Sequence, residues 1–237
     1  MTLYDKNGFV KSNHPHIKTT VSDLRNRIIS VFNRASIENG SGKINNDDDI
    51  CKLYIENKTA WIAAYDIIRM LPEAYCLAGS PVIVDAIKEC GVFEPALSGA
   101  EINIRVDMPA GEGSMPFPPH QDYPYNKGSS NGVVVWIPLQ DTDEKLGCLK
   151  YSPRSHEAGF IPGVIPSTPR LEGMVLSEDY VFEDIPMLAG ELLMFSMYLV
   201  HKSGVNSTKS SIRFSVQLRF NDLSNSDFAK RGFQRYE

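Results

Sequence analysis

The chain has 237 residues, of which 42% are hydrophobic, and this is enough for one domain with a sizeable core. Its 24 basic and 29 acidic residues give a net charge of -5 without a basic run, so we expect no nucleic-acid partner. The four cysteines form no C-x-x-C pair, and no apolar stretch approaches the ~18 residues that span a bilayer. We therefore expect a cytoplasmic protein with reduced thiols and no membrane span, whose oligomeric state the sequence leaves open.

The first hundred residues carry helical signals. Apolar residues at helical spacing, from Leu24 to Phe32, predict a helix that begins near Thr20 or Ser22 and ends before Gly40. After it, residues 47–49 are three aspartates, which are favourable at the positive end of a helix.

Two further helices are predicted in this part of the chain. One apolar stripe continues from the aspartates to Ile68, which indicates a single helix over that stretch. Another helix has Ser80 as its N-cap, Pro81 at its first position and Gly91 just past its end.

From about residue 101 the hydrophobic period changes to two. Residues 101–107 and 212–220 each alternate between an apolar and a polar face, as expected for strands between a core and a cavity. Residues 133–139 and 192–200 are nearly continuous apolar runs, typical of strands buried on both faces. Helices followed by strands with turn-rich breaks predict an α+β fold built on a double-sheet barrel.

One candidate metal-binding motif follows a Pro-Pro turn. On an extended segment, residues two apart project to the same side, so His120 and Asp122 could present an imidazole and a carboxylate to one ion. The motif by itself is weak, because a surface histidine beside an acidic turn residue gives the same pattern.

A second histidine and an arginine strengthen this interpretation. His201 ends the apolar run that starts at Gly190, and Arg213 follows 12 positions later on the polar face of the last strand (213 − 201 = 12). Two histidines and a carboxylate occupy one face of an octahedron in Fe(II) oxygen-activating sites. A guanidinium nearby can bind a carboxylate through two parallel hydrogen bonds.

Four elements of the sequence together resemble the phytanoyl-CoA dioxygenase family. They lie in residues 118–156 and 190–220, and with the opening Asn7-Gly8-Phe9-Val10 they cover about half of the chain. The matched elements are His120-Gln121-Asp122, Trp136 to Asp141, Gly147 to His156, and Gly190 through His201-Lys202-Ser203 to Arg213. Arg154 departs from the family pattern, which usually has glycine at that position.

The resemblance implies a fold and an activity. The fold would be a double-stranded β-helix (jelly-roll, cupin-like) barrel with N-terminal helices on one sheet: residues 1–100 mostly helical, 101–220 the core and 221–237 a tail of one domain. The activity would be hydroxylation of an unactivated C–H by Fe(II), 2-oxoglutarate and O₂, with release of succinate and CO₂. An acidic ligand in the metal motif favours hydroxylation over halogenation.

The same resemblance implies roles for individual residues. His120, Asp122 and His201 would hold the metal, and Arg213, helped by Asn103, Ser203 or Ser215, would bind 2-oxoglutarate. Candidate substrate contacts, chosen by alternation or by proximity to the motif, are Arg105, Tyr123, Tyr125, Lys150, Arg154 and Gln217. Their polar character predicts a small polar or anionic substrate.

Other interpretations stay open at the level of sequence. The chain could be a non-catalytic cupin-like protein that binds a small molecule, or a hydroxylase of a protein, a glycolipid or a surface sugar. The remaining histidines, His14, His16 and His156, are interpreted as structural rather than metal-binding.

Overall fold

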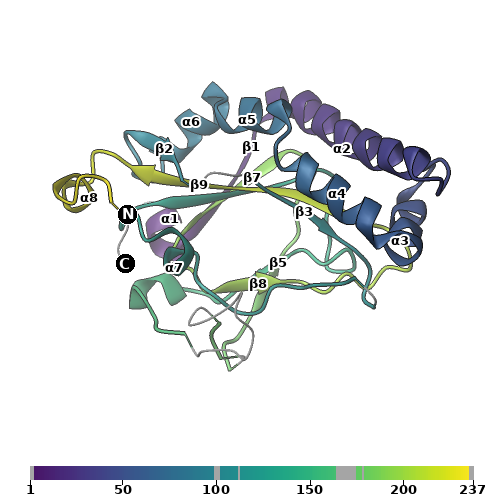
Figure 1. The fold of residues 1–237 in the computed structure, drawn as a ribbon. Helices are drawn as coiled ribbons and strands as arrows, with labels where there is room; N and C mark the ends of the chain where they lie inside the picture. The colour runs from purple at the N-terminus through teal and green to yellow at the C-terminus, as the bar shows by residue number, and fades with distance from the viewer. Residues whose placement is uncertain (1–2, 99–101, 112, 164–174, 178, 235–237) are drawn as a thin grey trace.

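The computed structural model describes residues 3–98, 102–111, 113–163, 175–177 and 179–234. A layer of helices covers one face of a large antiparallel sheet, and a small sheet lies on the opposite side (Figure 1). The helices are α1 (Leu3–Asn7), α2 (Lys18–Glu38), α3 (Asp47–Glu56), α4 (Lys58–Ile68), α5 (Pro72–Ala78), α6 (Pro81–Lys88), α7 (Tyr123–Asn126) and α8 (Ser226–Lys230), with 3₁₀ turns at Pro15–Ile17 and Ser155–Ala158.

The long helix α2 begins at Lys18, two residues before the earliest predicted start. A 3₁₀ turn at Pro15–Ile17 runs directly into it and supplies the first turn. Leu24, Ile28 and Phe32 are fully buried on one face, so the predicted apolar stripe belongs to the core that the helices share with the large sheet.

The predicted single helix after the aspartates is two helices, α3 and α4. The break is at Asn57, whose backbone (φ -145, ψ 70) leaves the helical region. Its side chain accepts a hydrogen bond from the amide of Ala60 at 3.2 Å and so caps α4. The apolar stripe continues through the break, because both helices pack on the same core, and this continuity concealed the boundary in the sequence.

The large sheet contains six strands in the order β1-β7-β4-β9-β2, with β3 also paired to β9. All of its pairings are antiparallel. Its strands are β1 (Phe9–Asn13), β2 (Pro95–Leu97), β3 (Asn103–Asp107), β4 (Val133–Pro138), β7 (Glu191–Ser196) and β9 (Arg213–Asp222).

The small sheet has three strands, β6 (Glu183–Ile185), β5 (Leu149–Tyr151) and β8 (His201–Ser203), in that order. A second apolar cluster, which includes Trp136, Phe195 and Leu149, joins it to the inner face of the large sheet. The α+β class and the helices on one sheet are thus confirmed. The two sheets face each other without closing into a barrel over the described ranges.

Alternation along β9 and β3 was predicted correctly. Phe214, Val216 and Leu218 lie in the core beneath the helices, and Arg213 and Gln217 face the opposite side toward the small sheet. β9 continues to Asp222, two residues beyond the predicted core, and α8 follows in the predicted tail.

The predicted strand over residues 192–200 is shorter than expected. β7 ends at Ser196, and the next four residues turn so that the chain enters the small sheet at His201. Leu199 and Val200 are buried within that turn, which explains why the apolar run outlasts the strand. His201 therefore starts β8 and does not end β7.

No single helix of the described part is long and apolar enough to cross a bilayer, although one bent pair, Lys58–Ala78 with Pro81–Lys88, meets the length and composition criteria.

The cap at Asn57 generates a stability prediction. Asn57→Ala removes the acceptor for the Ala60 amide and should lower the free energy of unfolding by about 1 kcal/mol. Urea denaturation measures the change. Asn26→Ala is the control, since Asn26 is exposed within α2, where alanine favours the helix; an equal loss in both variants would contradict the capping role.

Candidate metal centre and adjoining cavity

The two candidate histidine ligands are paired directly through their backbones. The amide of His120 donates to the carbonyl of His201 at 3.0 Å, and the amide of His201 donates back at 3.0 Å. This is an antiparallel bridge between a loop and the first residue of β8. Directly opposed residues place their side chains close together, and the two imidazole centroids lie 4.1 Å apart.

Asp122 reaches the same point by a turn and not by an extended strand. Its backbone is helical (φ -80, ψ -20), because it is the residue from which α7 starts. The neighbouring Gln121 side chain fixes this turn by donating to the carbonyl of Tyr198 at 2.6 Å and accepting from the amide of Ile161 at 2.9 Å. His120 and Asp122 lie close together as predicted. The extended segment on which that prediction was based is wrong, because the backbone turns at Asp122.

One ligand atom from each of His120, Asp122 and His201 lies within 4.8 Å of the others, and all three residues are buried. The Nδ1 atoms donate to backbone carbonyls, His120 to Pro118 at 2.8 Å and His201 to Leu199 at 2.9 Å. Because a carbonyl can only accept, each Nδ1 carries the proton and each Nε2 keeps a lone pair. The Nε2 of His201 lies 3.5 Å from Oδ2 of Asp122.

The environment sets the charge state of these groups. Burial and the neighbouring His201 lower the pKa of His120 to about 3, and burial also lowers the pKa of His201. Burial alone would raise the pKa of Asp122, but Arg219 and the two imidazoles hold it at about 2. At neutral pH the cluster is therefore two neutral imidazoles and one carboxylate, the charge state in which these groups bind a divalent metal.

Two residues of β9 hold the Asp122 carboxylate. Arg219 donates to Oδ1 through Nε at 2.9 Å and Nη2 at 2.6 Å, and Gln217 donates to Oδ2 at 2.9 Å. Hydrogen bonds to a ligating carboxylate orient it toward the metal. The alternation predicted over residues 212–220 places Arg219 on the same polar face as Arg213 and Gln217, and this was the signal that could have assigned Arg219 to the site.

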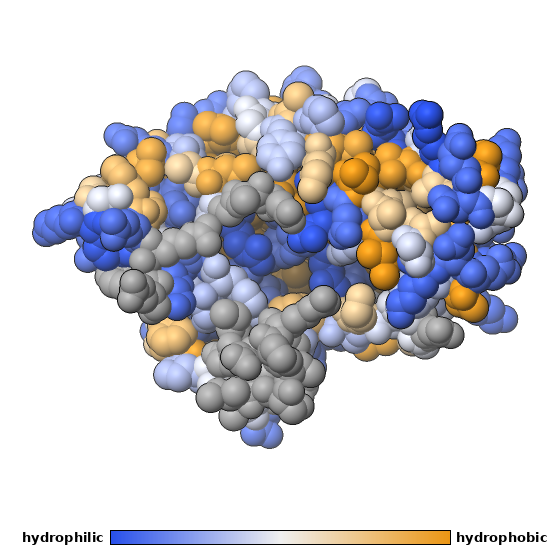
Figure 2. Space-filling model, in the orientation of Figure 1, coloured by the Kyte–Doolittle hydropathy of each residue, from blue (hydrophilic) through white to orange (hydrophobic). Residues whose placement is uncertain are grey.

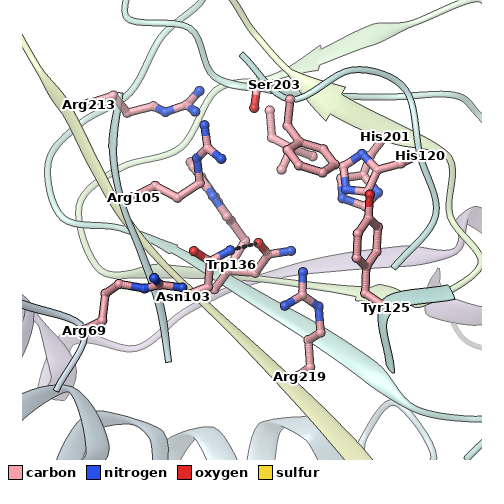
Figure 3. Close-up of a pocket in the computed structure, with 13 residues that line it drawn as sticks. Arg69, Asn103, Arg105, His120, Tyr125, Trp136, His201, Ser203, Arg213 and Arg219 are labelled. Atoms are coloured by element: carbon pink, nitrogen blue, oxygen red, sulfur yellow. Dashed lines mark hydrogen bonds between the residues drawn. The ribbon is translucent and has the colours of Figure 1, made fainter. Parts of the chain in front are cut away.

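A cavity of about 250 Å³ adjoins the cluster between the two sheets. Figure 2 shows the molecule hollowed on this face, with hydrophilic residues gathered around the hollow. In the close-up of Figure 3, His120 and His201 lie on one side of the cavity, and Arg69, Arg105 and Arg213 lie on the other. The lining residues are Arg69, Asn103, Arg105, Phe117, His120, Tyr125, Trp136, Leu149, His201, Ser203, Arg213, Gln217 and Arg219.

Arg213 lies deep in this cavity and is only 3% exposed. Its Nη2 donates to Asp107 at 2.7 Å, whereas its buried Nε has no hydrogen-bond partner among the described residues. The buried hydroxyl of Ser215, two residues along the same face of β9, likewise lacks a partner. Buried donors without acceptors are costly, so these two atoms indicate a place for an acceptor that binds there.

The other predicted contacts divide into two groups. Asn103 and Gln217 line the cavity and are joined by a hydrogen bond of 3.0 Å, and Arg105, Tyr125 and Ser203 also line it. The remaining three lie outside its lining: Tyr123 packs on Tyr198, Lys150 pairs with Asp184, and Arg154 pairs with Glu157.

The side chains of Arg154 and His156 contact other parts of the protein and do not line the cavity. The backbone of Arg154 is left-handed (φ 58), which favours glycine and explains why this position suits that residue. The exposed side chain points to Glu157, so it places no charge in the cavity. His156 contacts the backbone carbonyl of Asp5 at 3.1 Å, as its structural interpretation predicted.

Residues 40–215 match the family model described as phytanoyl-CoA dioxygenase (PhyH), which is well over half of the chain. The chain belongs to the phytanoyl-CoA dioxygenase family. The resemblance inferred from its motifs is thereby confirmed.

Curated relatives of this family member match only in part. A methylphosphonate hydroxylase of Gimesia maris is 29% identical over 138 residues, which are 56% of this chain and 48% of that protein. Phytanoyl-CoA dioxygenase domain-containing protein 1 of Bos taurus is 30% identical over 102 residues, 39% of this chain and 35% of that protein. The matches thus span about half of these relatives or less.

Solved structures share the fold at low sequence identity. The non-heme monooxygenase ThoJ in its apo form has a TM-score of 0.63 and 21% identity, covering 93% of this chain and 76% of that one. The epimerase SnoN, in complex with Fe3+, alpha ketoglutarate and nogalamycin RO, has a TM-score of 0.62 and 18% identity, covering 93% and 81%. The shared fold therefore extends over nearly the whole chain.

The lowered histidine pKa values predict how stability depends on pH. In the unfolded chain a histidine binds a proton near pH 6.5, but folded His120 does so only near pH 3. The unfolded state therefore binds more protons as pH falls, and stability is lost below about pH 6.5. For His120 the loss between pH 7.5 and pH 5 should be about 2 kcal/mol in the metal-free protein.

Denaturant titrations at the two pH values measure this effect. His120→Gln should reduce the pH dependence, and His16→Gln, at an exposed position, is the matched control. A pH dependence that is the same in both variants would contradict the assignment of a buried, neutral His120.

Proposed function

We propose that this protein is an Fe(II)- and 2-oxoglutarate-dependent dioxygenase that hydroxylates a C–H bond of a small anionic metabolite. The observation that carries the proposal is the convergence of three buried ligand atoms within 4.8 Å, one each from His120, Asp122 and His201. In the proposed reaction the substrate C–H becomes C–OH, O₂ is consumed, and 2-oxoglutarate is converted to succinate and CO₂.

The donor set fits the proposed metal. Two neutral imidazole nitrogens and one carboxylate oxygen match the facial triad of non-haem Fe(II) sites, which leaves three positions for other ligands. When bound, iron would supply the activation of O₂. The chain's contribution is to keep both Nε2 lone pairs available and the carboxylate oriented, through the carbonyls of Pro118 and Leu199 and the side chain of Arg219.

The unpartnered donors fit the proposed cosubstrate. A carboxylate at the deep end of the cavity would accept hydrogen bonds from Nε of Arg213 and Oγ of Ser215, which have no other partner in the described part of the chain. Asp107 holds the other side of the guanidinium at 2.7 Å and thereby fixes its plane. Asn103 lies farther along the cavity beside Gln217, so we assign it to the substrate side and not to the cosubstrate.

The comparisons support a small anionic substrate. The methylphosphonate hydroxylase that this chain resembles is named for such a molecule. A cavity of about 250 Å³ lies below the ~300–1,000 Å³ range of most ligand pockets, so it suits a small molecule. A binding protein without catalysis would need neither the three converging ligands nor the unpartnered Arg213 donor beside them.

The metal assignment predicts a spectroscopic result. Anaerobic addition of Fe(II) and then 2-oxoglutarate should produce the weak visible band of an iron chelate in the wild-type protein. Asp122→Ala should lose the band and all succinate release, because two imidazoles alone leave the triad incomplete. Asp23→Ala, an exposed substitution on α2, should behave as wild type. Wild-type succinate release by Asp122→Ala would refute the proposal.

The cosubstrate assignment predicts a separate change in affinity. Arg213→Lys keeps the charge but removes the planar pair of donors, so the Kd for 2-oxoglutarate should rise about tenfold or more. Titration of the visible band measures this Kd directly. Arg34→Lys, at an exposed position of α2, should leave it unchanged. An unchanged Kd in Arg213→Lys would mean that another group binds the distal carboxylate.

A further inference from the structure

We infer that the hydroxyl of Tyr125 binds 2-oxoglutarate at the metal end of the cavity, where it donates a hydrogen bond to the carboxylate that chelates the iron. This inference rests on the proposed function and adds a second anchoring residue to the cosubstrate site, at the opposite end from Arg213. It comes from a buried donor beside the metal ligands that the assignments above leave without a role.

The hydroxyl of Tyr125 is buried and has no hydrogen-bond partner among the described residues. Buried tyrosine hydroxyls usually have a partner, because a buried polar group without one is costly. Tyr125 also lines the cavity, so a molecule bound in the cavity can reach this group. An acceptor on such a molecule would remove the cost of the unpaired hydroxyl.

The short helix α7 places Tyr125 beside the metal ligand Asp122. The carbonyl of Asp122 accepts from the amide of Tyr125 at 3.1 Å, so the two residues share one helical turn. Residues three apart on such a turn lie on the same face. The next residue, Asn126, is buried and donates to Asn221 of β9 at 2.7 Å, which anchors the end of the helix to the large sheet.

The ring of Tyr125 packs against His120 and Phe117. Both contacts are edge-on, and the ring centroids are 5.8 Å apart in each pair. Figure 3 shows the side chain on the same side of the cavity as the two histidines, away from Arg213. Burial and the carboxylate of Asp122 raise the pKa of Tyr125, so the hydroxyl keeps its proton at neutral pH and is able to donate.

The acceptors that the chain itself offers next to Tyr125 have other partners. The two oxygens of Asp122 accept from Arg219 and Gln217. The Nε2 lone pair of His120 is the one that would bind the metal, since Nδ1 carries the proton. The acceptor for the Tyr125 hydroxyl therefore comes from a bound molecule.

The proposed cosubstrate brings an acceptor to this place. A 2-oxo acid chelates a metal through the oxo oxygen and one carboxylate oxygen, which leaves the second carboxylate oxygen free to accept. With the distal carboxylate on Arg213 and Ser215 at the deep end, the chelating end lies at the histidines, where Tyr125 is. A hydrogen bond from a phenol to a carboxylate is charge-assisted and hence stronger than one between neutral groups.

Tyr125→Phe tests this role, because it removes the hydroxyl and keeps the ring contacts. In the anaerobic Fe(II) protein, the Kd for 2-oxoglutarate should rise about tenfold through the loss of one charge-assisted hydrogen bond. The maximum of the visible band should also move, since the lost hydrogen bond acts on the chelating group that gives the band. The Kd for Fe(II) without 2-oxoglutarate, measured by isothermal titration calorimetry, should stay unchanged.

Two other variants serve as comparisons. Arg213→Lys acts on the distal carboxylate, so it should raise the Kd for 2-oxoglutarate and leave the band maximum in place. Tyr75→Phe removes a hydroxyl from the exposed side of α5 and should behave as wild type in every measurement.

Urea denaturation of the ligand-free protein separates a binding role from a structural one. Because the Tyr125 hydroxyl has no partner in the described part of the chain, Tyr125→Phe should not lower the unfolding midpoint. A lower midpoint, weaker binding of Fe(II), an unchanged Kd for 2-oxoglutarate or an unmoved band maximum in this variant would each overturn the inference.

The visible band of the wild-type protein separates the two levels of the proposal. If Fe(II) and 2-oxoglutarate give no band, the proposed function itself fails. If the band forms and Tyr125→Phe has the same band and the same Kd, only the role of Tyr125 fails, and the acceptor for its hydroxyl then belongs to the substrate.

Discussion

The bridge between His120 and His201 is the constraint on which the site depends. Two backbone hydrogen bonds of 3.0 Å hold residues that are 81 positions apart in the chain (201 − 120 = 81), and backbone pairing sets side-chain separation more rigidly than side-chain contacts could. The Phe195 ring packs edge-on against His201 with centroids 4.7 Å apart. The side chain of His201 therefore packs against the end of β7 in the large sheet, whereas the backbone of His201 belongs to β8 in the small sheet.

Strand β9 carries most of the remaining site on one face. Its inner face presents Arg213, Gln217 and Arg219, and its outer face is buried beneath the helices through residues such as Phe214 and Val216. A slip of one residue in its pairing would exchange the two faces and bury the arginines in the apolar core. The hydrophobic core thus fixes the register that places the functional side chains in the cavity.

Alternation and motif spacing carried the sequence predictions that succeeded. The period of two along β3 and β9 separated core from cavity correctly, because it depends only on strand geometry. Three features that depend on tertiary packing were not predicted from the sequence. They are the helix break at Asn57, the end of β7 at Ser196 and the position of Arg69 in the cavity lining. None of them interrupts a local pattern, and Arg69 looks like any polar residue after a helix.

The two halves of the site differ in how their polar groups are satisfied. Asp122 is fully buried, yet Arg219 and Gln217 already donate to both of its oxygens, so the charge of the metal half is compensated by the chain alone. At the deep end, Nε of Arg213 and Oγ of Ser215 have no hydrogen-bond partner within the described ranges. The fold therefore leaves the buried donors of Arg213 and Ser215 without acceptors among the described residues, whereas both oxygens of the Asp122 carboxylate accept hydrogen bonds. Such a difference is expected if the deep end gains its missing acceptor from a bound carboxylate, since the cost of the buried donors is then recovered on binding.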